Sequence, residues 1–231
     1  MTEVTIHAAD GGSFSAYVAA PRSGKGPGIL VLQEIFGVNQ VMRDLVDGFA
    51  GQGYVAMCPD LFWRQQPGIQ ITDKTEAEWQ RAFQLFQGFN VDKGIEDAKA
   101  ALAALRKHPA STGKVGTVGY CLGGKLAYLM ATRSDADANV GYYGVGLPDL
   151  LGEAKNIRRP LVLHIAEKDA YCPPEAQAAI TQGLGAKAGV TLYSYPGADH
   201  AFARVGGQHY DKAAADLANG RTAEFFHKTL G

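Results

Sequence analysis

The chain lacks an excess of charge of either sign and lacks long hydrophobic runs. It has 22 Lys and Arg against 23 Asp and Glu in 231 residues, a formal net charge of −1. This balance offers no basic surface for nucleic acid and no polybasic anchor for lipid. No apolar run approaches the roughly 18 residues that cross a bilayer, and no signal-like segment opens the chain. We expect a cytoplasmic protein that acts on a small molecule, with no nucleic-acid or membrane partner.

Cysteine is also scarce. The three cysteines are Cys58, Cys121 and Cys172, and no two of them form a Cys-x-x-Cys pair. This excludes a disulfide framework and a structural zinc site of the usual spacing. No cluster of His, Cys and carboxylates has metal-ligand spacing, so we expect no metal. A monomer is the expected oligomeric state.

The composition that is present fits an ordinary globular protein, with 46% hydrophobic and 19% charged residues. Short β-like runs alternate with helical patterns, which predicts βαβ units in one α/β domain over residues 1–231. The expected fold is a mostly parallel sheet with helices on both faces. The expected strands are 28–32, 54–57, 115–118, 140–143, 160–165 and 190–195, and the clearest helices are near 39–51, 93–107 and 210–227.

Residues 61–92 interrupt this alternation. The segment carries both tryptophans, Trp63 and Trp79, and several phenylalanines, including Phe83. It could cover an apolar pocket. The alternative is that these aromatic side chains simply pack beneath a long connection.

The most informative motif is Gly119-Tyr120-Cys121-Leu122-Gly123-Gly124. It follows an apolar run and precedes a helical pattern, so it predicts a strand, a sharp turn and a helix with a nucleophile at the turn. This is the arrangement of the Gly-x-Ser-x-Gly elbow of α/β-hydrolases, with a thiol in place of the hydroxyl. Thiols at helix N-termini ionise readily and are nucleophilic. The alternative is a buried, inert cysteine in a glycine-rich turn.

An acid and a base follow the nucleophile in the order of the α/β-hydrolase triad. Asp169 follows the strand 160–165, and His200 follows the strand 190–195. Asp199 is the rival acid, but adjacent side chains on a turn rarely orient each other's rings. The other histidines, His7, His108, His164, His209 and His227, are interpreted as structural or solvated.

These three residues would divide the work of acyl transfer. Cys121 attacks a carbonyl carbon, His200 moves its proton, and Asp169 orients the imidazole. The oxyanion needs two backbone N–H donors. We expect them from Leu122, at the start of the helix, and from Ile35, after an early strand.

Several ordered motifs together resemble the dienelactone hydrolase, or carboxymethylenebutenolidase, family over nearly the whole chain. They are Gln33 to Asn39, Cys58 to Leu61, Gly119 to Gly124, Gly141 to Gly144 and His200 to Arg204. The resemblance implies an α/β-hydrolase fold and cofactor-free hydrolysis of an enol lactone to maleylacetate during the breakdown of chlorinated aromatics. It also implies the triad Cys121, Asp169 and His200, with Glu34 as a carboxylate that contacts the resting thiol and helps to take its proton.

The resemblance also implies a substrate pocket. Phe36 and Tyr142 would line it, and Arg204 would bind the substrate carboxylate. The family enzyme that acts on dienelactone has a second arginine on the 61–92 segment, where this chain has Trp79. Arg81 lies two residues later, a rotation of about 200° on a helix, so we do not expect it to substitute.

Phe83 replaces a tyrosine of the family, which makes the expected pocket more apolar. Two other interpretations follow. One is a general hydrolase of small esters or lactones with a less anionic substrate, which the Trp79 change favours. The other is a thiol sensor without activity that uses Cys121 as an oxidisable group.

Overall fold

The computed structural model describes residues 2–231. They divide into a first unit that ends at Thr117 and a second unit that begins at Val118. The prediction of one domain over the whole chain stays a prediction. No helix in the described part of the chain is long and apolar enough to span a membrane.

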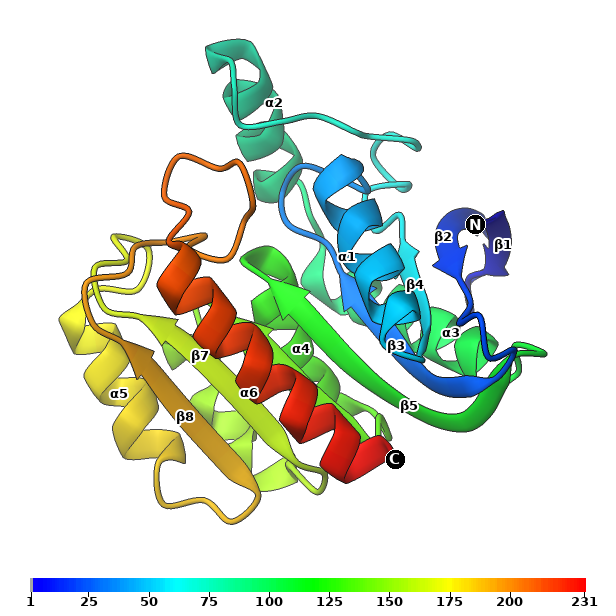
Figure 1. Cartoon of the computed structure of the whole chain (residues 1–231). Coiled ribbons are helices and arrows are strands. Elements are labelled where there is room, and N and C mark those ends of the chain that lie inside the picture. Colours follow the sequence, from blue (N-terminus) through cyan, green and yellow to red (C-terminus); the bar gives the residue numbers. More distant parts are fainter. Residues whose placement is uncertain (1) are drawn as a thin grey trace. The chain divides into compact units, whose positions relative to one another are not determined.

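The first unit contains the N-terminal strands and three helices. In chain order its elements are β1 (Thr2–His7), β2 (Ser13–Ala19), β3 (Gly26–Leu32), α1 (Gln40–Gly51), β4 (Val55–Pro59), α2 (Glu76–Gln87), α3 (Val91–Arg106) and most of β5 (Ser111–Tyr120). Its strands lie in the order β1-β2-β4-β3-β5. The pairs β1·β2 and β2·β4 are antiparallel, and β3·β4 is parallel. Helices α1 and α3 both pack on β3 and β4, with α1 in front of them in Figure 1.

The second unit begins at the end of β5 and carries the remaining elements. They are α4 (Leu122–Arg133), β6 (Ala138–Tyr142), the 3₁₀ helix η1 (Pro148–Asn156), β7 (Leu161–Ala166), α5 (Pro174–Leu184), β8 (Val190–Tyr195) and α6 (Lys212–Leu230). The strand order is β5-β6-β7-β8, with parallel β6·β7 and β7·β8 pairs. Helix α6 contacts β6 and lies in front of the sheet of this unit in Figure 1, whereas α4 lies behind the strands.

The predicted α/β architecture with a mostly parallel sheet is confirmed. Strands β6 and β7 are buried at every residue, as expected for strands covered on both faces. In a parallel sheet the loops after the strands' carboxyl ends lie at one edge. The loops after β5, β7 and β8 carry the predicted nucleophile, acid and base.

Residues 61–92 are more regular than the sequence predicted. They contain α2, which Thr75 caps at its N-terminus, and the first residues of α3. The Thr75 hydroxyl accepts from the amide N–H of Glu78 at 3.2 Å and donates to its carboxylate at 2.9 Å. This reciprocal cap starts a helix that buries only Ala82 and Leu85. Whether the segment covers a pocket stays a prediction.

Candidate active site

Cys121 lies at the sharp turn between β5 and α4. Its φ of 56° and ψ of −112° are strained for a residue with a Cβ. Gly119 permits the bend, because a Cβ there would lie 1.9 Å from the carbonyl oxygen of Gly123. A Cβ on Gly124 would lie 2.5 Å from the carbonyl oxygen of Tyr142. The structure therefore has the strand, turn and helix that the small residues of the motif predicted.

The turn also orients the first amides of α4. The Cys121 N–H donates to the Tyr142 carbonyl oxygen at 3.1 Å, which ties the turn to the end of β6. Leu122 is the first residue of α4. Amides in the first turn of a helix have no partner within the helix and carry the positive end of its dipole. The role of the Leu122 N–H as an oxyanion donor stays a prediction.

His200 and Asp169 meet although 31 residues separate them. The imidazole Nδ1 lies 2.7 Å from Asp169 Oδ2, and both side chains are buried. The other carboxylate oxygen, Oδ1, accepts from the backbone N–H of Tyr171 at 2.8 Å. Both oxygens of Asp169 thus have hydrogen-bond partners, so the carboxylate is fixed and can hold the imidazole of His200 in one orientation and one tautomer.

The imidazole of His200 interacts with the thiol as well. Burial disfavours its charged form, but the negative charge of Cys121 and the hydrogen bond to Asp169 outweigh burial and raise the pKa of His200 to about 10. A side-chain hydrogen bond to Cys121 adds to this rise in pKa. In the second unit the imidazole of His200 therefore hydrogen-bonds Asp169 and lies close enough to Cys121 for the two side chains to affect each other's charge.

The rival carboxylate lies elsewhere. Asp199 Oδ1 accepts from the backbone N–H of His200 at 2.6 Å, and its Oδ2 lies 3.5 Å from Nδ1 of His209. Asp199 therefore holds the backbone of the His200 loop, whereas Asp169 holds the ring.

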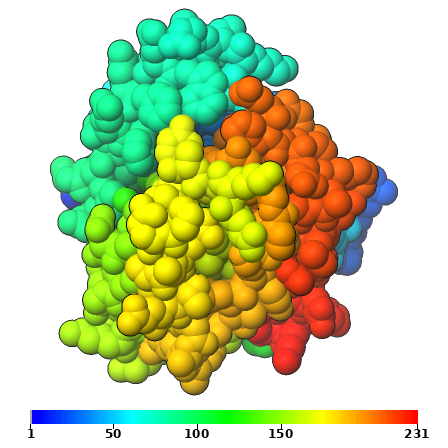
Figure 2. Space-filling model, turned by 90° about the vertical axis from the view of Figure 1, so that its left-hand side faces the viewer, coloured from blue at the N-terminus to red at the C-terminus, as the bar shows by residue number. Residues whose placement is uncertain are grey.

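Two tyrosines that the sequence did not single out contact the imidazole. The rings of Tyr143 and Tyr171 meet His200 edge-on, with centroids 5.2 Å and 4.8 Å away. Tyr171 is 51% exposed. Figure 2 shows the yellow surface of the segment that follows β7 beside the orange surface of the segment that follows β8. The only sequence signal was proximity: Tyr171 is two residues from Asp169, and Tyr143 lies in the Gly141–Gly144 motif.

Two other predicted binding residues belong to the second unit. Tyr142 is fully buried, and its hydroxyl donates to Asn219 Oδ1 at 3.0 Å and lies 2.7 Å from Thr222 Oγ1, both on α6. Its polar end therefore faces α6, and a role in lining the substrate pocket stays a prediction. Arg204 is buried. Burial raises the pKa of Tyr171, and the charge of Arg204 partly offsets this rise. Its binding to a substrate carboxylate also stays a prediction.

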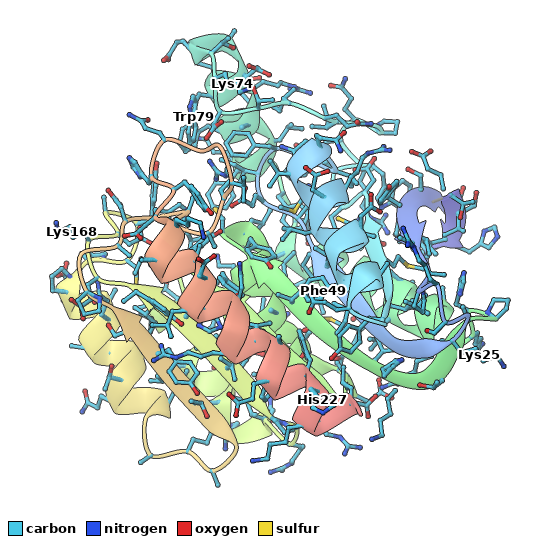
Figure 3. All side chains as sticks on the ribbon, in the orientation of Figure 1. Lys25, Phe49, Lys74, Trp79, Lys168 and His227 are labelled. Carbon is cyan, nitrogen blue, oxygen red and sulfur yellow. The ribbon has the colours of Figure 1, made fainter. Side chains whose placement is uncertain are left out.

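The remaining candidates lie in the first unit. Glu34, Ile35 and Phe36 follow β3 and are buried. The Phe36 ring packs edge-on against Trp79 at 5.1 Å. Trp79, labelled on α2 in Figure 3, stacks on Phe83 at 5.5 Å. These contacts join α2 to the loop after β3 through an aromatic group.

Arg81 points to other polar side chains. Its guanidinium donates to Gln66 Oε1 at 2.5 Å and to Gln84 Oε1 at 3.3 Å. Trp79 instead contacts Phe36 and donates through its indole N–H to the carbonyl oxygen of Asp73 at 2.9 Å. The two side chains therefore have different surroundings, as a two-residue offset on a helix requires.

We found no group of three or more metal-ligating side chains within residues 2–231. The other histidine of the buried core, His164, has both ring nitrogens within hydrogen-bonding distance of side-chain hydroxyls. Burial, with a smaller effect from Arg221, lowers its pKa to about 3. It is held neutral at physiological pH.

Comparisons with known proteins agree with the geometry. A model of the dienelactone hydrolase family matches residues 14–230. A protein of Azospirillum brasilense, provisionally named a carboxymethylenebutenolidase, is 55% identical over the full length of both chains. The carboxymethylenebutenolidase of Pseudomonas putida is 41% identical over 222 residues, 96% of this chain and 94% of that protein.

A solved structure has the same fold. The crystal structure of a provisionally described dienelactone hydrolase from Klebsiella pneumoniae matches with a TM-score of 0.84 and 26% identity. The match covers 99% of this chain and 100% of that chain. The predicted α/β-hydrolase fold is thereby confirmed.

Proposed function

Because the chain belongs to the dienelactone hydrolase family, we propose that it cleaves an enol lactone or a small ester through Cys121, His200 and Asp169. Its membership makes it an enzyme of the carboxylic ester hydrolase class. The relatives are named for the opening of a carboxymethylenebutenolide. The triad and the substrate are our proposal.

The observation that carries the triad is the pair of partners of one imidazole. Its Nδ1 lies 2.7 Å from Asp169 Oδ2, and the neighbouring Cys121 raises the pKa of the same ring. A nucleophile, a base and an orienting carboxylate in this series are the requirement for nucleophilic acyl transfer.

The proposed reaction has two halves. The Cys121 thiolate attacks the carbonyl carbon, and the bond to the ester oxygen breaks as that oxygen takes the proton of the His200 imidazolium. A thioester results. The now neutral imidazole takes a proton from water, the hydroxide attacks the thioester, and the carboxylic acid leaves as the thiolate reforms. The raised pKa of His200 supports the first half, because it keeps a proton available for the leaving oxygen.

Three backbone or acidic groups complete the proposal. The N–H groups of Leu122 and Ile35 would stabilise the oxyanion, and Glu34 would help to take the thiol proton. The helix start at Leu122 supports the first of these. The role of Ile35 rests on its place in the loop after β3, and the role of Glu34 rests on the family resemblance. A cytoplasmic, monomeric enzyme with no nucleic-acid or membrane partner also stays our prediction.

Substitution of the nucleophile tests this proposal. We expect Cys121→Ala to abolish hydrolysis of p-nitrophenyl acetate and of dienelactone while the circular dichroism spectrum is unchanged. The matched control is Cys172→Ala, a buried thiol whose pKa burial and the Asp169 charge raise to about 11. The control should retain activity. Activity of Cys121→Ala within tenfold of the wild type would refute the assignment.

Thiol labelling separates an enzyme from a thiol sensor. Iodoacetamide at pH 7 should label Cys121 and spare Cys172 and Cys58, because burial raises the pKa of both. An ester substrate should protect Cys121 and be turned over. Reversible oxidation of Cys121 without turnover of any ester would instead favour the sensor.

One observation favours the second candidate, a hydrolase of less anionic esters. Trp79 stands where the dienelactone-cleaving family member has an arginine, and it packs with Phe36 and Phe83. Arg81 is bound to Gln66 and Gln84. A charge-assisted hydrogen bond contributes about 1.5–3 kcal/mol, so the loss of one arginine would weaken preference for the acid by about tenfold to a hundredfold.

The variant Trp79→Arg tests this choice. If the wild-type substrate is less anionic, the new arginine should raise kcat/KM for dienelactone relative to p-nitrophenyl acetate. Trp79→Leu is the control that removes the ring without adding charge. An unchanged or lower ratio in a folded Trp79→Arg variant would contradict the proposed role of this position.

A further inference from the structure

A buried series of hydrogen bonds connects three strands of the second unit to α6. Tyr195 Oη lies 2.7 Å from His164 Nδ1, and His164 Nε2 lies 2.9 Å from Thr222 Oγ1. Thr222 Oγ1 lies 2.7 Å from Tyr142 Oη, which donates to Asn219 Oδ1 at 3.0 Å. Tyr195, His164 and Tyr142 belong to β8, β7 and β6, so the series crosses the sheet one strand at a time.

The hydrogen bond from Tyr142 to Asn219 determines which group donates and which accepts in the rest of the series. Tyr142 gives its only proton to the amide oxygen of Asn219, so it accepts from Thr222. The Thr222 proton is then used, and its oxygen accepts from Nε2–H of His164. His164 Nδ1 is the acceptor for Tyr195. His164 is therefore the neutral Nε2–H tautomer.

Arg221 lies at the other end of the series. Its guanidinium lies over the Tyr195 ring, 5.4 Å from the centroid, and over the Tyr193 ring at 4.1 Å. Burial raises the pKa of Tyr195, and Arg221 partly offsets this rise. The Tyr195 hydroxyl therefore keeps its proton and can donate it to His164.

Backbone carbonyls of two of these strand residues bind the amide of the proposed nucleophile and the amide of a tyrosine that packs on the proposed base. The Tyr142 oxygen accepts from the N–H of Cys121 at 3.1 Å. The His164 oxygen accepts from the N–H of Tyr143 at 2.8 Å, and the Tyr143 ring packs on His200. A shift of either strand residue would therefore move a group that touches the proposed nucleophile or base.

The carbonyl of Tyr195 holds the two remaining loops. It accepts from the N–H of Ala198 at 3.2 Å and from the N–H of Glu167 at 3.3 Å. Ala198 is two residues before His200, and Glu167 is two residues before Asp169. The backbone of Tyr195 thus fixes the positions of the loops that carry the base and the acid relative to each other.

We propose that His164 and Thr222 are positioning residues of the hydrolytic reaction, which set the register of β6, β7 and β8 and thereby the geometry of the triad. The inference rests on the proposed function, since it assigns the triad as catalytic. Thr222 is the central member, because its hydroxyl serves both His164 and Tyr142. Neither residue contacts a reacting atom.

The variant Thr222→Val tests the proposal with little change of shape. It leaves the Nε2–H of His164 without its acceptor and Tyr142 without its donor. Misplacement of reacting groups by about 1 Å can cost about a hundredfold in rate, so we expect kcat to fall by about tenfold to a hundredfold. KM should stay within about twofold, because the substrate contacts are untouched. Thr222→Ser keeps the hydroxyl and should restore kcat.

The matched control is Thr229→Val on the same helix. The Thr229 hydroxyl donates only to backbone carbonyls of α6, with Phe225 O at 2.7 Å. Thr229→Val should change stability slightly and leave kcat unchanged. If Thr222→Val does not fold, Tyr195→Phe provides the second variant, because it keeps the ring and removes the proton given to His164.

The outcomes are distinct. A normal kcat in folded Thr222→Val, or a loss that Thr222→Ser does not restore, would overturn the proposal. Equal losses in Thr222→Val and Thr229→Val would also overturn it, since the effect would then be one of helix stability. Failure of the proposed function shows differently, as hydrolysis that survives Cys121→Ala.

Discussion

The buried His164 predicts a specific loss of stability in acid. Burial first, and the charge of Arg221 second, lower the pKa of His164 from 6.5 to about 3 in the folded protein. Below pH 6.5 the imidazole of His164 binds a proton in the unfolded chain, whereas in the folded chain it stays neutral until the pH approaches 3. The stability that this group contributes is therefore complete above pH 6.5 and is lost as the pH falls toward 3.

The magnitude follows from linkage. With pKa values of 6.5 unfolded and about 3 folded, the free energy of unfolding should fall by about 3 kcal/mol between pH 7 and pH 4 on account of this one group. The variant His164→Gln removes the titration but retains an amide N–H that can donate toward Thr222. It should be less stable than the wild type at pH 7 and should lose about 3 kcal/mol less on acidification.

Urea unfolding followed by circular dichroism at pH 7, 5.5 and 4 measures this difference. His227→Gln, an exposed position on α6 labelled in Figure 3, is the control and should follow the wild type. Equal acid sensitivity of the wild type and His164→Gln would refute the reasoning, because His164 would then not be held neutral by its surroundings.

Two further predictions concern the triad. Asp169→Asn removes a hydrogen bond and a charge that help to raise the pKa of His200 to about 10. The basic limb of the pH profile of kcat/KM should therefore move to lower pH, and kcat should fall by about 10³–10⁴-fold. A basic limb that does not move would contradict this reasoning. Gly119→Ala should destabilise the protein by several kcal/mol and lower kcat, because its Cβ would lie 1.9 Å from the Gly123 carbonyl oxygen; Gly220→Ala, with open space in α6, is the thermal-melting control and should gain about 0.5–1 kcal/mol.

The sequence predicted the central strands because they are apolar at nearly every position. The edge strand β1 and its neighbour β2 were not predicted. Ile6 is the one buried residue of β1, and β2 begins with the exposed Ser13 and Ser15, so neither short strand is apolar along its whole length. Helix α2 was not predicted as an element of the fold, although Trp79, Ala82, Phe83 and Phe86 recur at the three- and four-residue spacing of a helix. The aromatic residues of 61–92 were interpreted instead as a pocket cover or as a packed connection.

The order of the site residues along the chain was predictable, but their surroundings were not. Strand ends fix where Cys121, Asp169 and His200 lie, and the turn residues mark those ends. The contact of Tyr171 with His200 depends on the direction of a side chain in a loop. The bond between Thr222 and Tyr142 joins residues 80 positions apart, and only the packing of α6 on the sheet brings them together.

Strain and the buried hydrogen bonds occur in the same place. Within residues 2–231, the residues other than glycine with positive φ are Cys121, Tyr143 and Ala201, in the loops after β5, β6 and β8. Such conformations cost on the order of 1–3 kcal/mol each and persist only where surrounding contacts fix them. The N–H of Cys121 is fixed by the Tyr142 carbonyl, and that of Tyr143 by the His164 carbonyl. Breaking the series through Thr222 removes a restraint on the two strand residues, Tyr142 and His164, whose carbonyls hold these strained loops. We therefore expect loss of the Thr222 hydroxyl to lower kcat strongly while the melting temperature changes little.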